Sequence, residues 1–131
     1  MQRKMKTNEL GRRGEDAAAK YLEKSGYAVI SRNERIGRIE TDIICEGDGH
    51  TVFCEVKTRT PASKKYGRPS AAVDRKKREN LIRFAEAYIR SKKAAGAFLA
   101  PPRIDVVEVY IDGKDVKIHH MKNAVIKETN D

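Results

Sequence analysis

The sequence lacks any apolar run that approaches the roughly 20 residues of a membrane-spanning helix. Its first segment, MQRKMKTNEL, has no apolar core of the kind that a secretory signal needs. We therefore expect no membrane contact and a cytoplasmic location. A chain of 131 residues is long enough for one hydrophobic core but not for two. We expect a single domain over residues 1–131, with flexible ends at about 1–7 and 124–131.

Cysteine is scarce, and the arrangement of the two cysteines argues against a metal or redox motif. Cys45 and Cys54 lie in apolar, strand-like runs without CxxC or Cys/His ligand spacing, which favours buried thiols over a disulfide or a zinc site. His119 and His120 are adjacent, so on a strand they would point to opposite faces and would not readily share one metal ion.

Acidic residues are in the minority. The sequence has 19 Asp and Glu against 28 Lys and Arg, which gives a formal net charge of +9. An excess of cations favours a polyanionic partner, because Lys and Arg that meet phosphates release condensed counterions. Nucleic acid is the first expectation, and a solvated basic surface without a partner is the alternative.

Periodicity and turn residues predict an α/β fold. Helices are expected from an N-cap at Asn8 to just before Gly26, and over about 71–96. Strands are expected at 27–33, 39–47, 50–59, 103–111 and 116–120, a mobile basic loop at 60–70, and one helical turn near the C-terminus. The central strand pair is apolar on both faces near its turn, which predicts a sheet covered by helices on two sides.

The first helix carries two features that bear on a site. Gly11 and Gly14 cost helix propensity, which predicts that a strand or a phosphate chain comes close there. Glu15 lies at the edge of the predicted apolar stripe, so its carboxylate can reach inward. The stripe comprises Leu10, Ala17, Ala18, Tyr21 and Leu22.

The segment IETDIICEGDGHTVFCEVKTR is typical of a β-hairpin with Asp48-Gly49 as a two-residue type I′ turn. This turn fixes the register and places Asp42 directly opposite Glu55, and Glu40 opposite Lys57. Directly opposed like charges destabilise a hairpin unless a cation lies between them.

Two opposed carboxylates suit Mg²⁺ or Mn²⁺, which is typically held by one or two carboxylates together with a substrate phosphate. Lys57 would then orient or help deprotonate the attacking water. The alternative is purely structural, with cross-strand ion pairs between Glu40 and Lys57 and between Asp42 and a nearby arginine.

Asp42 followed by Glu55-Val56-Lys57 resembles the PD-(D/E)XK nuclease signature, and GRRGEDAAAKYL would supply the helical glutamate of archaeal Holliday junction resolvases. More narrowly, the chain is similar along nearly its whole length to the YraN-type family of small bacterial proteins related to those resolvases. The resemblance is carried by Gly14-Glu15 with Ala18, Gly26-Tyr27, Arg32-Asn33, Glu40-Thr41-Asp42, Phe53 to Arg59, Lys76, Arg103 with Asp105-Val106-Val107, and Asn123-Ala124.

The resemblance implies a restriction-endonuclease-like sandwich, with a central mixed sheet of about five strands flanked by helices. It implies that Asp42, Glu55 and the Val56 carbonyl hold Mg²⁺ or Mn²⁺, that Glu15 approaches the metal directly or through water, and that Lys57 acts on the water. The roles of Glu40, Arg103 and Asp105 stay open.

DNA contact is expected from basic residues around this site. Cations at the start of the long helix oppose its macrodipole, which makes sense if phosphates lie there, although a solvated basic patch is the alternative. No base-reading module is recognisable, so we expect contacts with the backbone and no sequence specificity. The candidates are Arg12, Arg13, Lys64, Lys65, Arg68, Arg75, Lys76 and Lys77, with Tyr66 in the same loop.

These inferences predict a metal-dependent endonuclease that hydrolyses phosphodiesters in DNA, with branched DNA among the expected substrates. Cleavage of a four-way junction requires two sites and hence a homodimer. The second hypothesis is a nucleic-acid-binding module that keeps the nuclease fold without turnover. The third is a basic interaction protein with structural ion pairs only.

Overall fold

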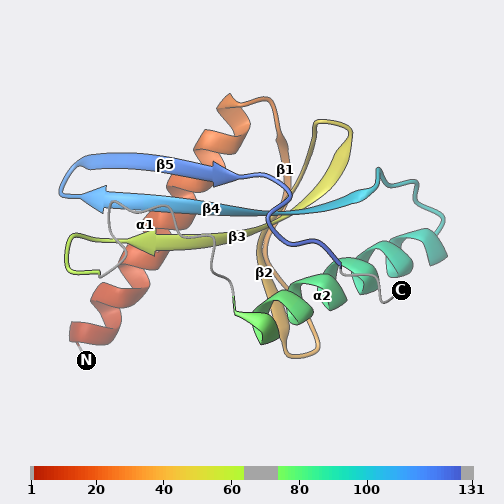
Figure 1. The fold of residues 1–131 in the computed structure, drawn as a ribbon, viewed down its shortest axis with the longest axis horizontal. Coiled ribbons are helices and arrows are strands. Elements are labelled where there is room, and N and C mark those ends of the chain that lie inside the picture. Colours follow the sequence, from red (N-terminus) through yellow and green to blue (C-terminus); the bar gives the residue numbers. More distant parts are fainter. Residues whose placement is uncertain (1, 64–73, 128–131) are drawn as a thin grey trace.

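The computed structural model describes residues 2–63 and 74–127, which form a five-stranded sheet between two helices (Figure 1). The strands follow one another across the sheet in chain order, and among them only β3 and β4 pair in parallel. This arrangement confirms the predicted restriction-endonuclease-like sandwich. The elements are α1 (Gln2–Lys24), β1 (Ala28–Ile36), β2 (Ile39–Gly47), β3 (His50–Arg59), α2 (Arg75–Ala94), β4 (Pro102–Asp112) and β5 (Asp115–Met121).

The β2–β3 hairpin has the predicted turn and, over most of its length, the predicted register. Asp48 and Gly49 both have positive φ, 53° and 75°, as a type I′ turn requires. Paired residues run from Gly47–His50 to Ile43–Cys54. The expected direct pairs Asp42–Glu55 and Glu40–Lys57 are wrong, because β2 stays paired with β1 beyond this point while β3 stays paired with β4. β2 and β3 therefore separate at Asp42.

One face of the sheet packs against α1. Ala18 and Leu22 are fully buried there, with Leu10, Ala17 and Tyr21 partly buried around them, as the apolar stripe predicted. A Cβ on Gly14 would lie 1.9 Å from Thr58 Oγ1 of β3, which confirms the close approach predicted at that glycine. A Cβ on Gly11 would have no atom within 4 Å, so the same prediction is not confirmed at Gly11. Gly14 lets α1 lie close to β3 just before Glu15.

The other face packs against α2, which connects the parallel strands β3 and β4 as a crossover helix. The predicted inward stripe is confirmed: Leu81, Phe84, Ala85 and Tyr88 are buried and Ile89 is partly buried. Asp74 is the N-cap, and its side chain accepts a hydrogen bond from the Lys77 N–H at 2.8 Å. This cap fixes the position where α2 begins.

The structure also corrects predictions at the element ends. α1 begins at Gln2, so Asn8 is not an N-cap, and the expected flexibility of residues 1–7 stays a prediction. The segment 122–127 contains no helical turn. Val125 is 4% exposed and belongs to the core cluster beneath α2, and the Ala124 N–H donates to the Ile104 carbonyl at 2.8 Å. These two contacts tie Ala124 and Val125 to the core.

No helix within residues 2–63 and 74–127 is long and apolar enough to cross a membrane. Both cysteines are fully buried, as predicted, with their sulfur atoms 4.0 Å apart.

Candidate active site

The candidate active site lies where β2 and β3 separate. Ile44 of β2 and Phe53 of β3 face α2. Asp42 lies two residues before Ile44, and Glu55 lies two residues after Phe53, so the Asp42 and Glu55 side chains point to the same face of the sheet. Asp42 Oδ2 accepts a hydrogen bond from the Val56 N–H at 2.8 Å, in place of a carbonyl of β2. The N–H and C=O of one strand residue point to the same side, so the Val56 carbonyl faces this gap too. The structure thus brings together three of the four groups that the resemblance assigned to the metal, namely Asp42, Glu55 and the Val56 carbonyl.

Burial makes the two carboxyl groups an electrostatically costly pair. Glu55 is 3% exposed, and its carboxyl group lies beside that of Asp42, close enough to perturb its pKa. The pKa of Asp42 is raised from 3.8 to about 7, chiefly by burial and then by the charge of Glu55 and the hydrogen bond between the two groups. The Val56 N–H lowers this pKa but does not offset the other effects. A divalent cation at this position would favour the ionised form of both groups.

Asp42→Asn is expected to stabilise the metal-free protein at high pH. A carboxyl group whose pKa rises from 3.8 to about 7 on folding destabilises the folded state, by roughly 4 kcal/mol at most. This cost is absent below about pH 4, grows as the pH rises towards 7, and is complete above that value. Urea unfolding with a chelator should therefore show the variant to be more stable at about pH 8 and equal to the parent protein at about pH 4.

Glu40→Gln is the matched control for this measurement. Glu40 is also on β2, but its carboxylate is half-exposed and pairs with Arg35 at 3.0 Å, so its removal should change stability by less than about 1 kcal/mol. A destabilised Asp42→Asn variant at about pH 8 would instead mean that the Asp42 charge has a favourable partner in the fold.

Two lysines approach the buried Glu55 carboxylate. Lys57 Nζ lies 3.5 Å from Glu55 Oε2, and Lys77 Nζ, from the first turn of α2, lies 3.0 Å from the same oxygen. Burial lowers the pKa of Lys77, but the hydrogen bond to Glu55 and the charges of Glu55, Asp42 and Asp74 outweigh it and raise the pKa overall. Lys57 lies beside the carboxylates as predicted. Lys77, which the sequence assigned to DNA contact, lies inside the site.

Glu15 approaches from the opposite face of the sheet. Its carboxylate lies 3.8 Å from Arg32, which also pairs with Asp16 at 2.8 Å. The charge of Glu15 contributes to the raised pKa of Asp42, but less than burial and Glu55 do. Glu15 is therefore near the site, and its direct or water-mediated contact with a metal stays a prediction.

The site fits a cation that takes few protein ligands. Within the described part of the chain, no group of three or more His, Cys, Asp or Glu side chains is placed to hold a metal ion. Mg²⁺ and Mn²⁺ do not require such a group, because one or two carboxylates with waters and a substrate phosphate suffice. Partly buried Asp42, buried Glu55 and the Val56 carbonyl carry hard oxygen atoms that suit such a cation.

The ion pairs expected from a purely structural role are not those observed. Glu40 pairs with Arg35 of β1, and Lys57 pairs with Glu55 of its own strand. Among the ion pairs of the described residues, none joins Asp42 to an arginine. Asp42 therefore accepts a hydrogen bond from a backbone N–H and lies beside a second carboxyl group, whose charge raises its pKa.

The residues expected to contact DNA, apart from Lys77, divide into three groups. Arg75 and Lys76 are exposed near the start of α2. Arg12 and Arg13 are exposed on α1, and Arg13 donates to the Gly113 carbonyl in the β4–β5 turn at 2.6 Å. The third group lies outside the described residues and comprises Lys64, Lys65, Tyr66 and Arg68.

A buried polar cluster away from this site explains Arg103 and Asp105, whose roles the sequence left open. Asp105 is fully buried and accepts hydrogen bonds from Arg103 at 2.7 and 2.9 Å, from His120 at 2.7 Å and from the Asn123 N–H at 2.9 Å. Arg103 also donates to the Tyr27 hydroxyl at 2.8 Å. Burial opposes the charge, but these hydrogen bonds outweigh it and hold the pKa of Asp105 below its usual value. The cluster connects β4 and β5 with the C-terminal segment and with Tyr27, the residue before β1.

Comparison with known proteins places the chain in a family. The model of Uncharacterised protein family UPF0102 matches residues 14–109. This chain belongs to that family. It is the family of small bacterial proteins that the sequence resembles.

Individual members of UPF0102 are similar over nearly the whole chain. A UPF0102 protein of Caldicellulosiruptor saccharolyticus is 41% identical over 122 residues, which cover 92% of this chain and 99% of the relative. A UPF0102 protein of Alkaliphilus metalliredigens is 44% identical and covers 88% of this chain and 96% of the relative. The solved structure of Pyrococcus furiosus SfsA in complex with Ca²⁺ matches with a TM-score of 0.42 and 17% identity, over 88% of this chain and 63% of that chain. A similarity at that level supports no argument.

Proposed function

We propose that this UPF0102 protein is a metal-dependent nuclease that hydrolyses phosphodiester bonds in DNA. The observation that carries the proposal is the Asp42–Glu55 pair, in which Glu55 is buried and Asp42 partly buried, and in which burial and the second carboxyl group raise the pKa of Asp42 to about 7. A bound divalent cation would offset the repulsion between the two carboxylates. Carboxyl groups with strongly shifted pKa values are typical of functional sites.

Each group of the site has a role in this proposal. Asp42, Glu55 and the Val56 carbonyl hold Mg²⁺ or Mn²⁺, which when bound polarises the phosphoryl group and makes a bound water more acidic. Lys57 orients the attacking water and stabilises the negative charge that develops on the phosphoryl oxygens. Lys77 holds Glu55 in place from α2 with its ion pair of 3.0 Å. Glu15 supports the site from α1.

DNA is the proposed substrate because the chain carries a net charge of +9 and exposed cations at the start of α2 beside the carboxylates. The contacts would go to the phosphate backbone, so recognition would follow DNA shape and not sequence. Cleavage of four-way junctions would further require a homodimer with two sites.

The test is a panel of duplex, single-stranded, flap and four-way DNA substrates, incubated with Mg²⁺ or Mn²⁺ and with a chelator. Cleavage of at least one substrate that requires the divalent ion supports the proposal. Binding of these DNAs without any cleavage would favour the alternative, a nucleic-acid-binding module that retains the fold without turnover. Neither binding nor cleavage of any substrate would overturn both.

A further inference from the structure

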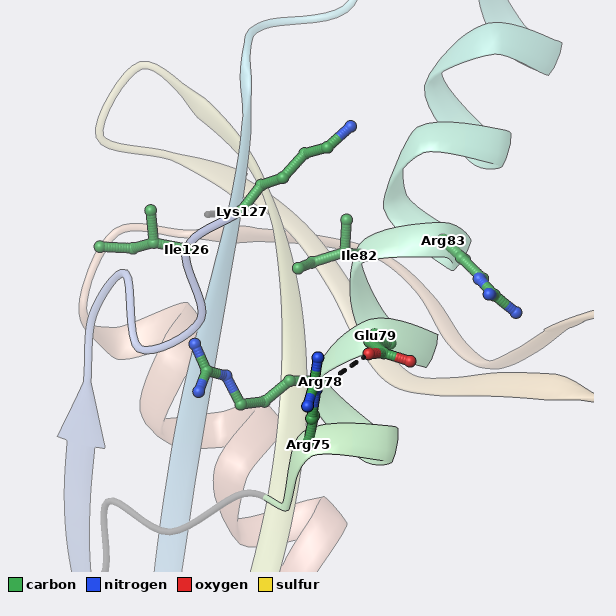
Figure 2. A pocket seen from close by; sticks show the side chains of 7 residues that line it. All are labelled: Arg75, Arg78, Glu79, Ile82, Arg83, Ile126 and Lys127. Atoms are coloured by element: carbon green, nitrogen blue, oxygen red, sulfur yellow. Dashed lines mark ion pairs between the residues drawn. The ribbon is translucent and has the colours of Figure 1, made fainter. Parts of the chain in front are cut away.

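A cationic groove lies between α2 and the C-terminal segment, next to the candidate active site. Figure 2 shows its lining, with Arg75 and Arg78 where α2 begins, Lys127 on the facing segment, and Ile82 and Ile126 between them. We propose that this groove, referred to below as the α2 groove, binds the phosphate backbone of the DNA strand that leads away from the cleavage site. The inference rests on the proposed function and names the surface that holds its substrate.

The walls of the α2 groove are held in place by the fold. On one side, α2 packs on the sheet through Leu81, Phe84 and Tyr88. On the other, the segment that carries Ile126 and Lys127 is anchored by buried Val125 and by the hydrogen bond from the Ala124 N–H to Ile104. The groove therefore exists before a ligand binds, so little ordering cost would oppose binding.

The charge of the α2 groove suits a polyanion. Of the described residues that line it, Arg75, Arg78, Arg83 and Lys127 are cationic and Glu79 is acidic. Arg75 pairs with Glu79 at 3.4 Å, and Lys127 pairs with Glu86 at 2.8 Å. Both pairs are well exposed, and exposed ion pairs are weak enough for phosphates to replace them.

The position of the α2 groove points to a strand that runs to the active site. The first turn of α2 presents Lys77 to Glu55 on its inner side and Arg75 and Arg78 to the groove. From Arg75 to Arg83 the helix rises about 12 Å, at about 1.5 Å per residue. A DNA strand advances about 3.4 Å per nucleotide, so the groove would accommodate about three or four nucleotides. Its apolar floor of Ile82 and Ile126 suits the sugars.

The test compares Arg83→Glu combined with Lys127→Glu against a matched pair of charge reversals elsewhere. Neither residue is one of the proposed catalytic or metal-binding groups, and neither was assigned from the sequence. The control is Lys20→Glu combined with Lys24→Glu, two exposed lysines on α1, which covers the opposite face of the sheet. Both double variants change the net charge equally. A difference in DNA affinity between them would therefore come from the position of the charges and not from the overall charge.

Affinity for a fluorescently labelled DNA duplex is measured by anisotropy over a range of salt concentrations, with a chelator present, and folding is checked by thermal unfolding. We expect the Arg83/Lys127 variant to bind at least about tenfold more weakly than the control, and the slope of log K against log salt to fall by about two. The same titration is run with poly-glutamate as a second polyanion.

Each outcome decides the inference. Equal affinities and slopes in the two variants, with the parent protein binding DNA, would overturn the role of the α2 groove and leave the proposed function standing. Groove-dependent binding of poly-glutamate without groove-dependent binding of DNA would assign the groove to an acidic peptide instead. Absence of DNA binding by the parent protein would overturn both the inference and the proposed function.

Discussion

Asp42→Asn is expected to lower divalent-ion-dependent DNA cleavage by about a thousandfold, and Lys57→Ala by about a hundredfold or more. The amide of the Asp42→Asn variant would keep an oxygen that can accept the Val56 N–H, which in the parent protein donates to Asp42 at 2.8 Å, so the backbone should hold its position. The substitution would remove the negative charge that binds the cation beside Glu55. Lys57→Ala removes the ammonium group 3.5 Å from Glu55 and leaves both carboxylates. Initial rates on whichever DNA the panel identifies as a substrate measure both effects.

Glu40→Gln is the control for these rates, because it neutralises a carboxylate of the same strand that pairs with Arg35 outside the site. Its cleavage rate should stay within a fewfold of the parent rate. Binding of the substrate in the presence of a chelator should be nearly unchanged in the Asp42 and Glu40 variants. Full cleavage by both Asp42→Asn and Lys57→Ala would show that the chemistry occurs elsewhere.

Arg103→Ala is expected to destabilise the fold by about 3 to 5 kcal/mol, because it leaves the buried Asp105 carboxylate without its cation. Asp105 is fully buried, and Arg103 donates to both of its oxygens. The hydrogen bonds from His120 and the Asn123 N–H would remain, but the two that Arg103 donates would be lost. Chemical unfolding near neutral pH measures the change.

Arg35→Ala is the matched control for stability, since it breaks the more exposed pair with Glu40 and should cost less than about 1 kcal/mol. Comparable effects of Arg103→Ala and Arg35→Ala would mean that the cluster around Asp105 adds little to stability. A large loss with retained cleavage at low temperature would confirm that Arg103 has a structural role and no catalytic one.

Local signals in the sequence were sufficient for much of the fold. The Asp48-Gly49 turn fixes the register from Gly47–His50 to Ile43–Cys54, because a two-residue turn leaves no choice of pairing next to it. The spacing of Leu81, Phe84, Ala85 and Tyr88 predicts the buried face of α2. These features depend on neighbouring residues, which is why the sequence alone predicts them.

Features that depend on tertiary packing were missed. The separation of β2 from β3 at Asp42 depends on the competing partners β1 and β4, so the turn could not predict where the pairing ends. Lys77 reaches Glu55 because α2 packs across the sheet at that point. The residues next to Lys77 in the sequence indicated only that the helix begins with basic residues. The Asp74 N-cap was a local signal for that geometry, since it fixes the turn that carries Lys77.

Thermal unfolding with and without Mn²⁺ at about pH 8 shows whether Asp42 and Glu55 together bind a divalent cation. A ligand that binds only the folded state stabilises it by about 2.7 kcal/mol at a concentration of about one hundred times its dissociation constant. We predict that Mn²⁺ raises the melting temperature of the parent protein by several degrees, leaves that of Asp42→Asn unchanged, and raises that of Glu40→Gln as in the parent. The same increase in Asp42→Asn, or none in the parent protein, would contradict the account.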